Sequence, residues 1–105
     1  MQNVYSIFDL KGSTYEGLYT FVSDIDAVRF FDAITLRTET KFFTYPEDFA
    51  LVCLGSFDDR TGSFSACEAT HRMITTVLDR KVFFEVQKQI FEQKVVTEKG
   101  ETENA

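Results

Sequence analysis

Side chains that could perform catalysis are few in this chain. It contains 1 His and 2 Cys, namely His71, Cys53 and Cys67. A structural zinc site takes about four ligands, and the two cysteines lack the Cys-x-x-Cys spacing typical of such sites. The segment 58–62, DDRTG, lacks the alternating oxygen ligands and the distal Glu of a calcium loop, and no Gly-rich phosphate loop is present. We therefore expect no enzyme activity, no metal and no cofactor.

Aromatic side chains offer a different chemistry. The chain has 12 Phe and 4 Tyr but no Trp, and aromatic rings can stack on the bases of single-stranded nucleic acid. Tyr15 and Tyr19 alternate with Phe21, so they are expected on one face of a strand. That face is either an open stacking platform or, if a helix covers it, part of the core. Gly17, in the middle of this strand, suggests a bulge or close packing.

Basic side chains that could support such a site are confined to one stretch. The formal net charge of -6 argues against a broad phosphate-binding surface. Residues 1–71 are acidic, whereas residues 72–94 carry more bases than acids. An ordinary solvated helix face with ion pairs explains the same charges. The candidate DNA-binding set is Tyr15, Tyr19, Arg72, Arg80, Lys81 and Lys88.

A third possibility is an interaction surface between copies of the chain. The segment from Arg80 to Lys94 has the spacing of a helix whose apolar residues extend over more than one face. One face would pack on a sheet and the other would be free to bind a second copy. The candidate self-association residues are Phe83, Phe84, Ile90 and Phe91.

The elements that must position these residues follow from the hydrophobic pattern. Period-two alternation predicts strands, and i, i+3, i+4 spacing predicts helices. Ser23 is expected to cap the first helix, whose apolar stripe leaves Phe30 exposed. The nearly apolar run 49–57 is expected to be a central strand covered on both faces. The predicted order is strand 4–10, strand 14–22, helix 23–37, strand 49–57, strand 63–69, an ambiguous segment 70–81, and a last helix from about Arg80 to Lys94, capped by Asp79.

These elements predict one α+β domain over residues 1–97, with an antiparallel sheet of about four strands, one helix between strands 2 and 3 and a C-terminal helix. The length of 105 residues suits a single core. Residues 98–105 are expected to form a flexible acidic tail. No signal peptide and no membrane-spanning run is visible in the sequence. The two cysteines are expected to be buried thiols, although a bridge is feasible if their strands pair.

Several of these residues resemble the central signature of the small non-structural proteins of gokushoviruses, the single-stranded DNA phages of the Microviridae. The resemblance lies in Pro46-Glu47-Asp48-Phe49, Leu54-Gly55-Ser56-Phe57-Asp58-Asp59 and Thr61-Gly62, and in the opening Tyr5-Ser6-Ile7-Phe8-Asp9. It extends over about residues 3–70, and the segment after Thr70 departs from the pattern. It implies a protein associated with viral DNA, without an enzymatic motif, located in the host cytoplasm and absent from the virion.

The leading hypothesis is therefore a non-enzymatic phage protein that acts in genome replication or packaging, with single-stranded DNA as its candidate ligand. The alternative is a homo-oligomeric interaction module that regulates the replication initiator or the procapsid without contacting DNA. The acidic net charge is in tension with the first and compatible with the second. No membrane is expected among the partners.

Overall fold

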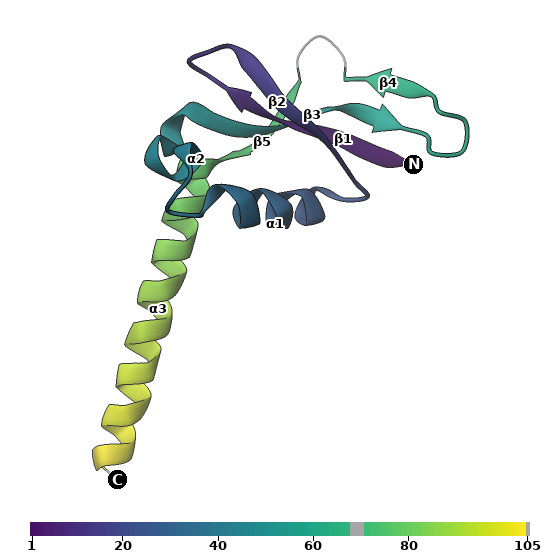
Figure 1. Cartoon of the computed structure of the whole chain (residues 1–105). Helices are drawn as coiled ribbons and strands as arrows, with labels where there is room; N and C mark the ends of the chain where they lie inside the picture. Colours follow the sequence, from purple (N-terminus) through teal and green to yellow (C-terminus); the bar gives the residue numbers. More distant parts are fainter. Residues whose placement is uncertain (68–70, 105) are drawn as a thin grey trace.

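The computed structural model describes residues 1–67 and 71–104, with side chains described as far as Gln93. In this part of the chain, five strands form one antiparallel sheet in the order β2-β1-β3-β4, and β5 also pairs with β3 (Figure 1). The elements are β1 (Gln2–Asp9), β2 (Thr14–Phe21), α1 (Asp24–Thr35), α2 (Lys41–Thr44), the 3-10 helix η1 (Pro46–Asp48), β3 (Phe49–Phe57), β4 (Phe64–Ala66), β5 (Arg72–Thr76) and α3 (Val77–Asn104).

The first half of the fold agrees with the elements predicted from the sequence. The predicted α+β class, the β1–β2 hairpin, α1 and β3 are all confirmed. Ser23 is the N-cap of α1, and its hydroxyl accepts a hydrogen bond from the Asp26 backbone N–H. Gly62, in the loop after β3, has a φ of 78°, a backbone conformation that glycine adopts without the steric cost of a Cβ.

The second half of the sheet differs from the prediction. The fourth strand ends at Ala66, and residues 68–70 lie outside the described part of the chain. The ambiguous segment contains β5, which pairs with residues 50–53 of β3, whereas β4 pairs with residues 55–57. Two short strands therefore follow one another along the same edge of β3. Residues 73–76, MITT, are rich in β-branched side chains, but their pairing partner is a tertiary feature that local propensity does not identify.

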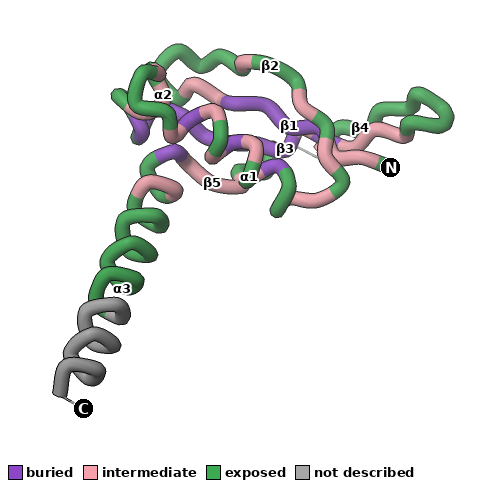
Figure 2. Tube along the Cα trace, turned by 60° about the horizontal axis from the view of Figure 1, so that its bottom comes forward, coloured by how far each residue is buried: buried purple, intermediate pink, exposed green. Residues whose placement is uncertain are grey.

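The core lies between the sheet and α1. Tyr5, Ile7, Phe31 and Leu51 are at most 1% exposed, and they belong to a buried cluster that also includes Ala27, Phe49, Cys53 and Val77. Figure 2 shows this burial concentrated on the central strands β1 and β3. The prediction that β3 is covered on both faces is confirmed for residues 49–53, all of which are buried. α1 covers one face, and no helix of the described part of the chain covers the opposite face (Figure 1).

The last helix is longer than predicted. α3 begins at Val77, and its first turn is capped by the Thr76 hydroxyl, which accepts a hydrogen bond from the Asp79 N–H at 3.1 Å. Asp79 thus lies inside the helix and is not its cap. The helix continues past Lys94 to Asn104 and runs away from the domain (Figures 1 and 2). The predicted boundary between a domain over 1–97 and a flexible tail over 98–105 stays a prediction.

Candidate functional site

A bulge at Gly17 places Tyr15 and Tyr19 on opposite faces of the sheet. Tyr5 pairs with Tyr19, and the pair after the bulge lies two residues further along β1 but three residues back along β2. Because side chains alternate along a strand, the extra residue inverts their alternation. The Gly17 carbonyl accepts a hydrogen bond from the Ser6 hydroxyl at 2.7 Å, which holds the bulge in place. The predicted shared face of the two tyrosines is therefore wrong.

Tyr19 lies on the face that α1 covers. Its ring centroid is 4.7 Å from that of Phe30, and the Phe30 ring is also 5.3 Å from that of Phe21. Phe30, which the helix pattern leaves exposed, is half-buried because the aromatic side chains of β2 extend over it. Tyr19 thus contributes to packing between β2 and α1 and is not part of an open stacking platform.

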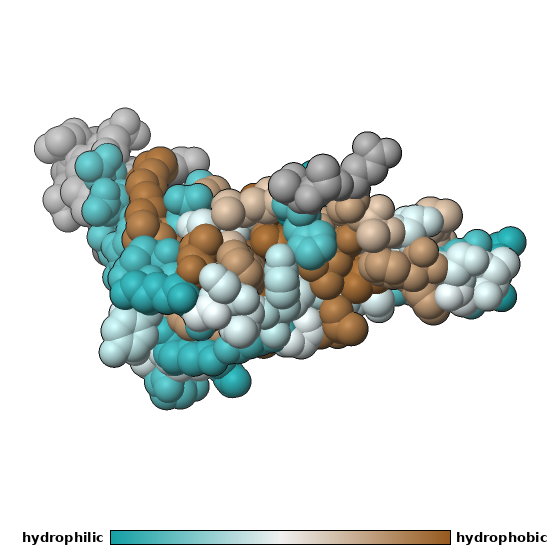
Figure 3. Space-filling model, turned by 90° about the horizontal axis from the view of Figure 1, so that it is seen from above, coloured by the Kyte–Doolittle hydropathy of each residue, from teal (hydrophilic) through white to brown (hydrophobic). Residues whose placement is uncertain are grey.

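Tyr15 lies on the opposite face, which no helix of the described part of the chain covers and which we call the open face. Its ring is 4.7 Å from that of Phe8, and its hydroxyl is 2.8 Å from Nδ1 of His71. Figure 3, which looks down on the open face, shows apolar side chains extending across the sheet. The apolar and aromatic residues that line this face are Val4, Phe8, Tyr15, Leu18, Val52, Leu54, Phe57, Phe64 and Met73.

Two depressions lie on the open face. One, of about 420 Å³, is lined by Val4, Leu18, Thr20, Leu54, Phe57 and Phe64. The other, of about 400 Å³, is lined by Phe8, Leu10, Tyr15, Val52, Cys67, His71 and Met73. Phe8, Phe57 and Phe64 are the aromatic residues of this face that sequence reasoning missed. The alternation within each strand indicates which side chains share a face. It does not indicate which of the two faces α1 covers.

The basic candidates do not gather on the open face. Arg72, from β5, forms two hydrogen bonds with Asp24 of α1, at 2.9 and 3.2 Å. The Tyr5 hydroxyl donates to the same carboxylate at 2.6 Å. Arg72 and Tyr5 lower the pKa of Asp24, whereas burial and the Asp24 hydrogen bond raise the pKa of Tyr5 to about 12. Arg72 is therefore part of a structural network.

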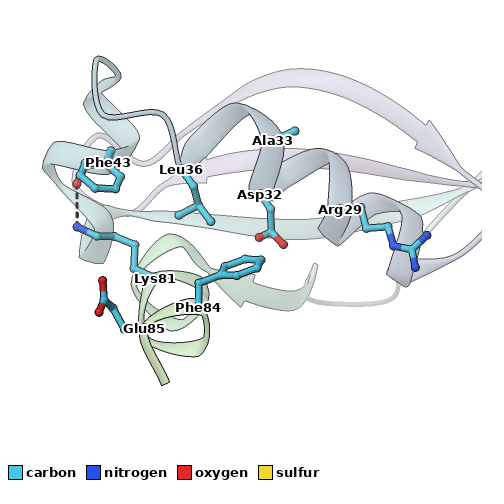
Figure 4. Close-up of a pocket in the computed structure, with 8 residues that line it drawn as sticks. All are labelled: Arg29, Asp32, Ala33, Leu36, Phe43, Lys81, Phe84 and Glu85. Carbon is cyan, nitrogen blue, oxygen red and sulfur yellow. Dashed lines mark hydrogen bonds between the residues drawn. The ribbon is translucent and has the colours of Figure 1, made fainter. Parts of the chain in front are cut away.

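Arg80 and Lys81 attach the base of α3 to the domain. The Arg80 guanidinium forms a two-pronged ion pair with Asp32 of α1, with both N–O distances at 2.8 Å, and this pairing raises the pKa of Arg80. The Lys81 ammonium donates to the Phe43 carbonyl at 3.3 Å. Figure 4 shows Lys81 and Phe84 beside α1 and α2, where they line a groove of about 580 Å³.

The remaining candidates lie on α3 from Val82 onward, which we call its projecting part, although Phe84 also lines the groove beside α1. Lys88 is exposed, and so are the four predicted self-association residues, Phe83, Phe84, Ile90 and Phe91. The structure therefore separates the six predicted DNA-binding residues over the open face, the α1 side and α3. It brings the four self-association residues together on one helix.

The residues considered for catalysis lie near one another, since the Cys67 thiol donates to the Cys53 carbonyl at 3.5 Å and Cys67 and His71 line the same depression. Cys53 is buried and Cys67 is half-buried, both as free thiols, and burial raises the pKa of the Cys53 thiol. Among the described side chains, no group of three or more His, Cys, Asp or Glu residues could hold a metal ion. Within the same part of the chain, no helix is long and apolar enough to cross a membrane.

The fold and its surfaces define a small α+β protein with one uncovered sheet face and a projecting helix. A model of the Phage ORF5 protein family matches residues 2–80, so the chain belongs to this family. Protein ORF5 of Chlamydia phage 1, a gokushovirus, is 33% identical over 84 residues, which cover 76% of this chain and 84% of the relative. The resemblance to small gokushovirus proteins is thereby confirmed. No solved structure matches the chain.

Proposed function

We propose that this chain is a non-enzymatic, non-structural phage protein that acts in genome replication or packaging in the host cytoplasm, and that it binds single-stranded DNA on the open face. Membership of the Phage ORF5 family supports a phage role. The observation that carries the DNA proposal is the uncovered sheet face with aromatic side chains from four strands: Phe8, Tyr15, Phe57 and Phe64. This set replaces the basic candidates, of which Arg72 and Arg80 are held in ion pairs.

Stacking suits this surface better than phosphate binding does. Base–aromatic stacking contributes about 1–3 kcal/mol per base and tolerates any sequence. Lys11 and Arg60 are exposed in the loops at the two ends of the β1–β3 ladder, near the ends of a strand lying along the sheet. Lys11 pairs with Asp48 at 3.7 Å, so a phosphate would replace this contact. Because so few cations are available, we expect a dissociation constant in the micromolar range. The decrease in affinity with salt should correspond to about two phosphate contacts.

Fluorescence anisotropy with a labelled oligo-dT at low salt tests this proposal. Tyr15→Ala and Phe64→Ala should each weaken binding by about tenfold, the loss of one stacked base. Tyr45→Ala is the matched control, because Tyr45 is 54% exposed but lies between α2 and η1, away from the open face. Absence of binding at tens of micromolar protein, or equal losses in Tyr15→Ala and Tyr45→Ala, would contradict the proposal.

A second candidate function is a homo-oligomeric interaction module that regulates the replication initiator or the procapsid without contacting DNA. The exposed apolar side chains of α3 favour it, because a surface of this kind marks an interaction site. Light scattering of the full chain at two concentrations tests the self-association part. A strict monomer at both concentrations would remove this candidate.

A further inference from the structure

α3 has two sides with different surroundings. With 3.6 residues per turn, Val77, Lys81 and Phe84 lie on the side that faces α1 and α2. Val77 is fully buried, and Figure 4 shows Lys81 and Phe84 directed towards these helices. The opposite side, which we call the outer face of α3, consists of Val82, Phe83, Val86 and Ile90.

Nothing in the described part of the chain covers the outer face. The exposed fractions of Val82, Phe83, Val86 and Ile90 are 53%, 44%, 46% and 56%. Figures 1 and 2 show α3 extending well beyond the sheet and α1. A helix without tertiary contacts is marginal in water, because most helical stability in proteins comes from packing an amphipathic face. The outer face therefore needs an apolar partner.

We propose that the outer face of α3 pairs with the same face of a second copy of this chain, in an antiparallel two-helix interface. Phe83, Val86 and Ile90 are separated by three and four residues, the spacing of the apolar seam between paired helices. This inference rests on the second candidate function above, and it names the face and the partner. In the antiparallel arrangement, Phe83 lies opposite Ile90 of the second copy.

The charges of α3 favour a second copy of the chain as the partner. Between Val77 and Gln93 there are three acidic and three basic residues, so this segment is neutral although the whole chain carries -6. Gln87 and Gln89, which flank the outer face, are uncharged. The charged residues Glu85, Lys88 and Glu92 lie on the far side of the helix. Two copies therefore approach along this face without like-charge repulsion.

Two details of the base of α3 favour this pairing. The Arg80 guanidinium lies 4.5 Å from the Phe83 ring centroid and is itself fixed by Asp32, so Phe83 is already ordered before it binds a partner. Asp79 lies on the same line of the helix, at the end nearest the domain. A parallel pair would bring the two Asp79 carboxylates together, whereas an antiparallel pair keeps them apart.

Sedimentation velocity of the full chain, from low to high micromolar concentration, tests the inference. We expect a reversible dimer. The double variant Val86→Glu/Ile90→Glu should weaken it by about 100-fold or more, since it places charge in the apolar seam. Lys88→Glu is the matched control, because it changes the net charge equally on the far side of the helix, and it should leave the dimer intact. Circular dichroism of each variant at low concentration checks that the fold is retained.

The outcomes separate this inference from the function on which it rests. A strict monomer at high concentration overturns both. A dimer that survives Val86→Glu/Ile90→Glu overturns the outer face as the interface but leaves self-association standing. Asp79→Asn should not change the dimer affinity in an antiparallel pair. A marked gain in affinity for that variant would overturn the antiparallel orientation.

Discussion

The domain and the projecting part of α3 have the same kinds of apolar residue in opposite environments. In the domain, Tyr5, Phe31 and Leu51 are at most 1% exposed, and β1 hydrogen-bonds on both sides to neighbouring strands. In α3, every described residue from Val82 to Gln93 is exposed, including Ile90 and Phe91. The family match covers residues 2–80, so it includes the domain and ends in the first turns of α3.

This difference separates two sources of stability. The domain buries its own core between α1 and the sheet, so its folding does not depend on concentration. The backbone hydrogen bonds of α3 are local, but its apolar side chains beyond Phe84 gain little from packing on the rest of the fold. We therefore expect the domain to unfold as one cooperative unit, and the projecting part of α3 to gain stability only when its outer face is covered.

The largest expected difference in stability is between alanine variants of two phenylalanines, one from each region. Phe31→Ala should lower the free energy of unfolding by about 3–5 kcal/mol, because it removes a fully buried ring and leaves a cavity. Phe91→Ala should change it by no more than about 0.5 kcal/mol, since Phe91 is 67% exposed and lies off the outer face. Urea unfolding followed by circular dichroism measures both. Similar losses in the two variants would abolish the distinction between the regions.

A smaller effect is expected where the two regions join. Arg80→Ala leaves the Asp32 carboxylate, only 14% exposed, without its ion-pair partner. This variant should lower the free energy of unfolding by about 2 kcal/mol. Lys88→Ala, on the projecting part of α3, should cost almost nothing. The cost of Asp32→Asn should not add to that of Arg80→Ala in a double-mutant cycle, because both remove the same contact. Additive costs would show that the pair does not attach α3 to α1.

Most of the domain could be predicted from the sequence because its elements are locally determined. Ser23 begins α1 with a cap, Ala27 and Phe31 recur at helical spacing, and β3 is an uninterrupted apolar run. The elements that could not be predicted depend on tertiary pairing. β5 is defined by its partner in β3, and the helical spacing of α3 alone does not show that it leaves the domain.

The candidate site was less predictable for the same reason. One inserted residue at Gly17 moves Tyr15 and Tyr19 to different faces, and the sequence suggested the bulge but not its consequence. Arg72 and Arg80 appeared free in the sequence because their partners, Asp24 and Asp32, are each 48 positions away. Charge counted along the chain therefore overestimates the charge available to a ligand when the counterions come from another element.

The smallest expected effect concerns the link between α1 and β5, the strand that leads into α3. Arg72 and Tyr5 lower the pKa of Asp24 below its usual value near 3.9, so the native state favours the carboxylate. The stabilisation is present above pH of about 4 and is lost as the pH falls through the lowered folded-state pKa. Since the Asp24 and Arg72 side chains are 40% and 54% exposed, we expect their ion pair to contribute no more than about 1 kcal/mol to the free energy of unfolding.

Urea unfolding between neutral pH and acid pH compares the original chain with Asp24→Asn, which cannot titrate at this position. The difference in unfolding free energy between the two should shrink in acid, where Asp24 is protonated and the amide is a fair mimic of the neutral acid. Glu47→Gln is the control, because Glu47 is an exposed carboxylate on η1 and should show no such convergence. A difference that stays constant with pH would mean that the Asp24 contact stabilises β5 through hydrogen bonding alone, and that the charge of this carboxylate contributes nothing to holding the base of α3 on the domain.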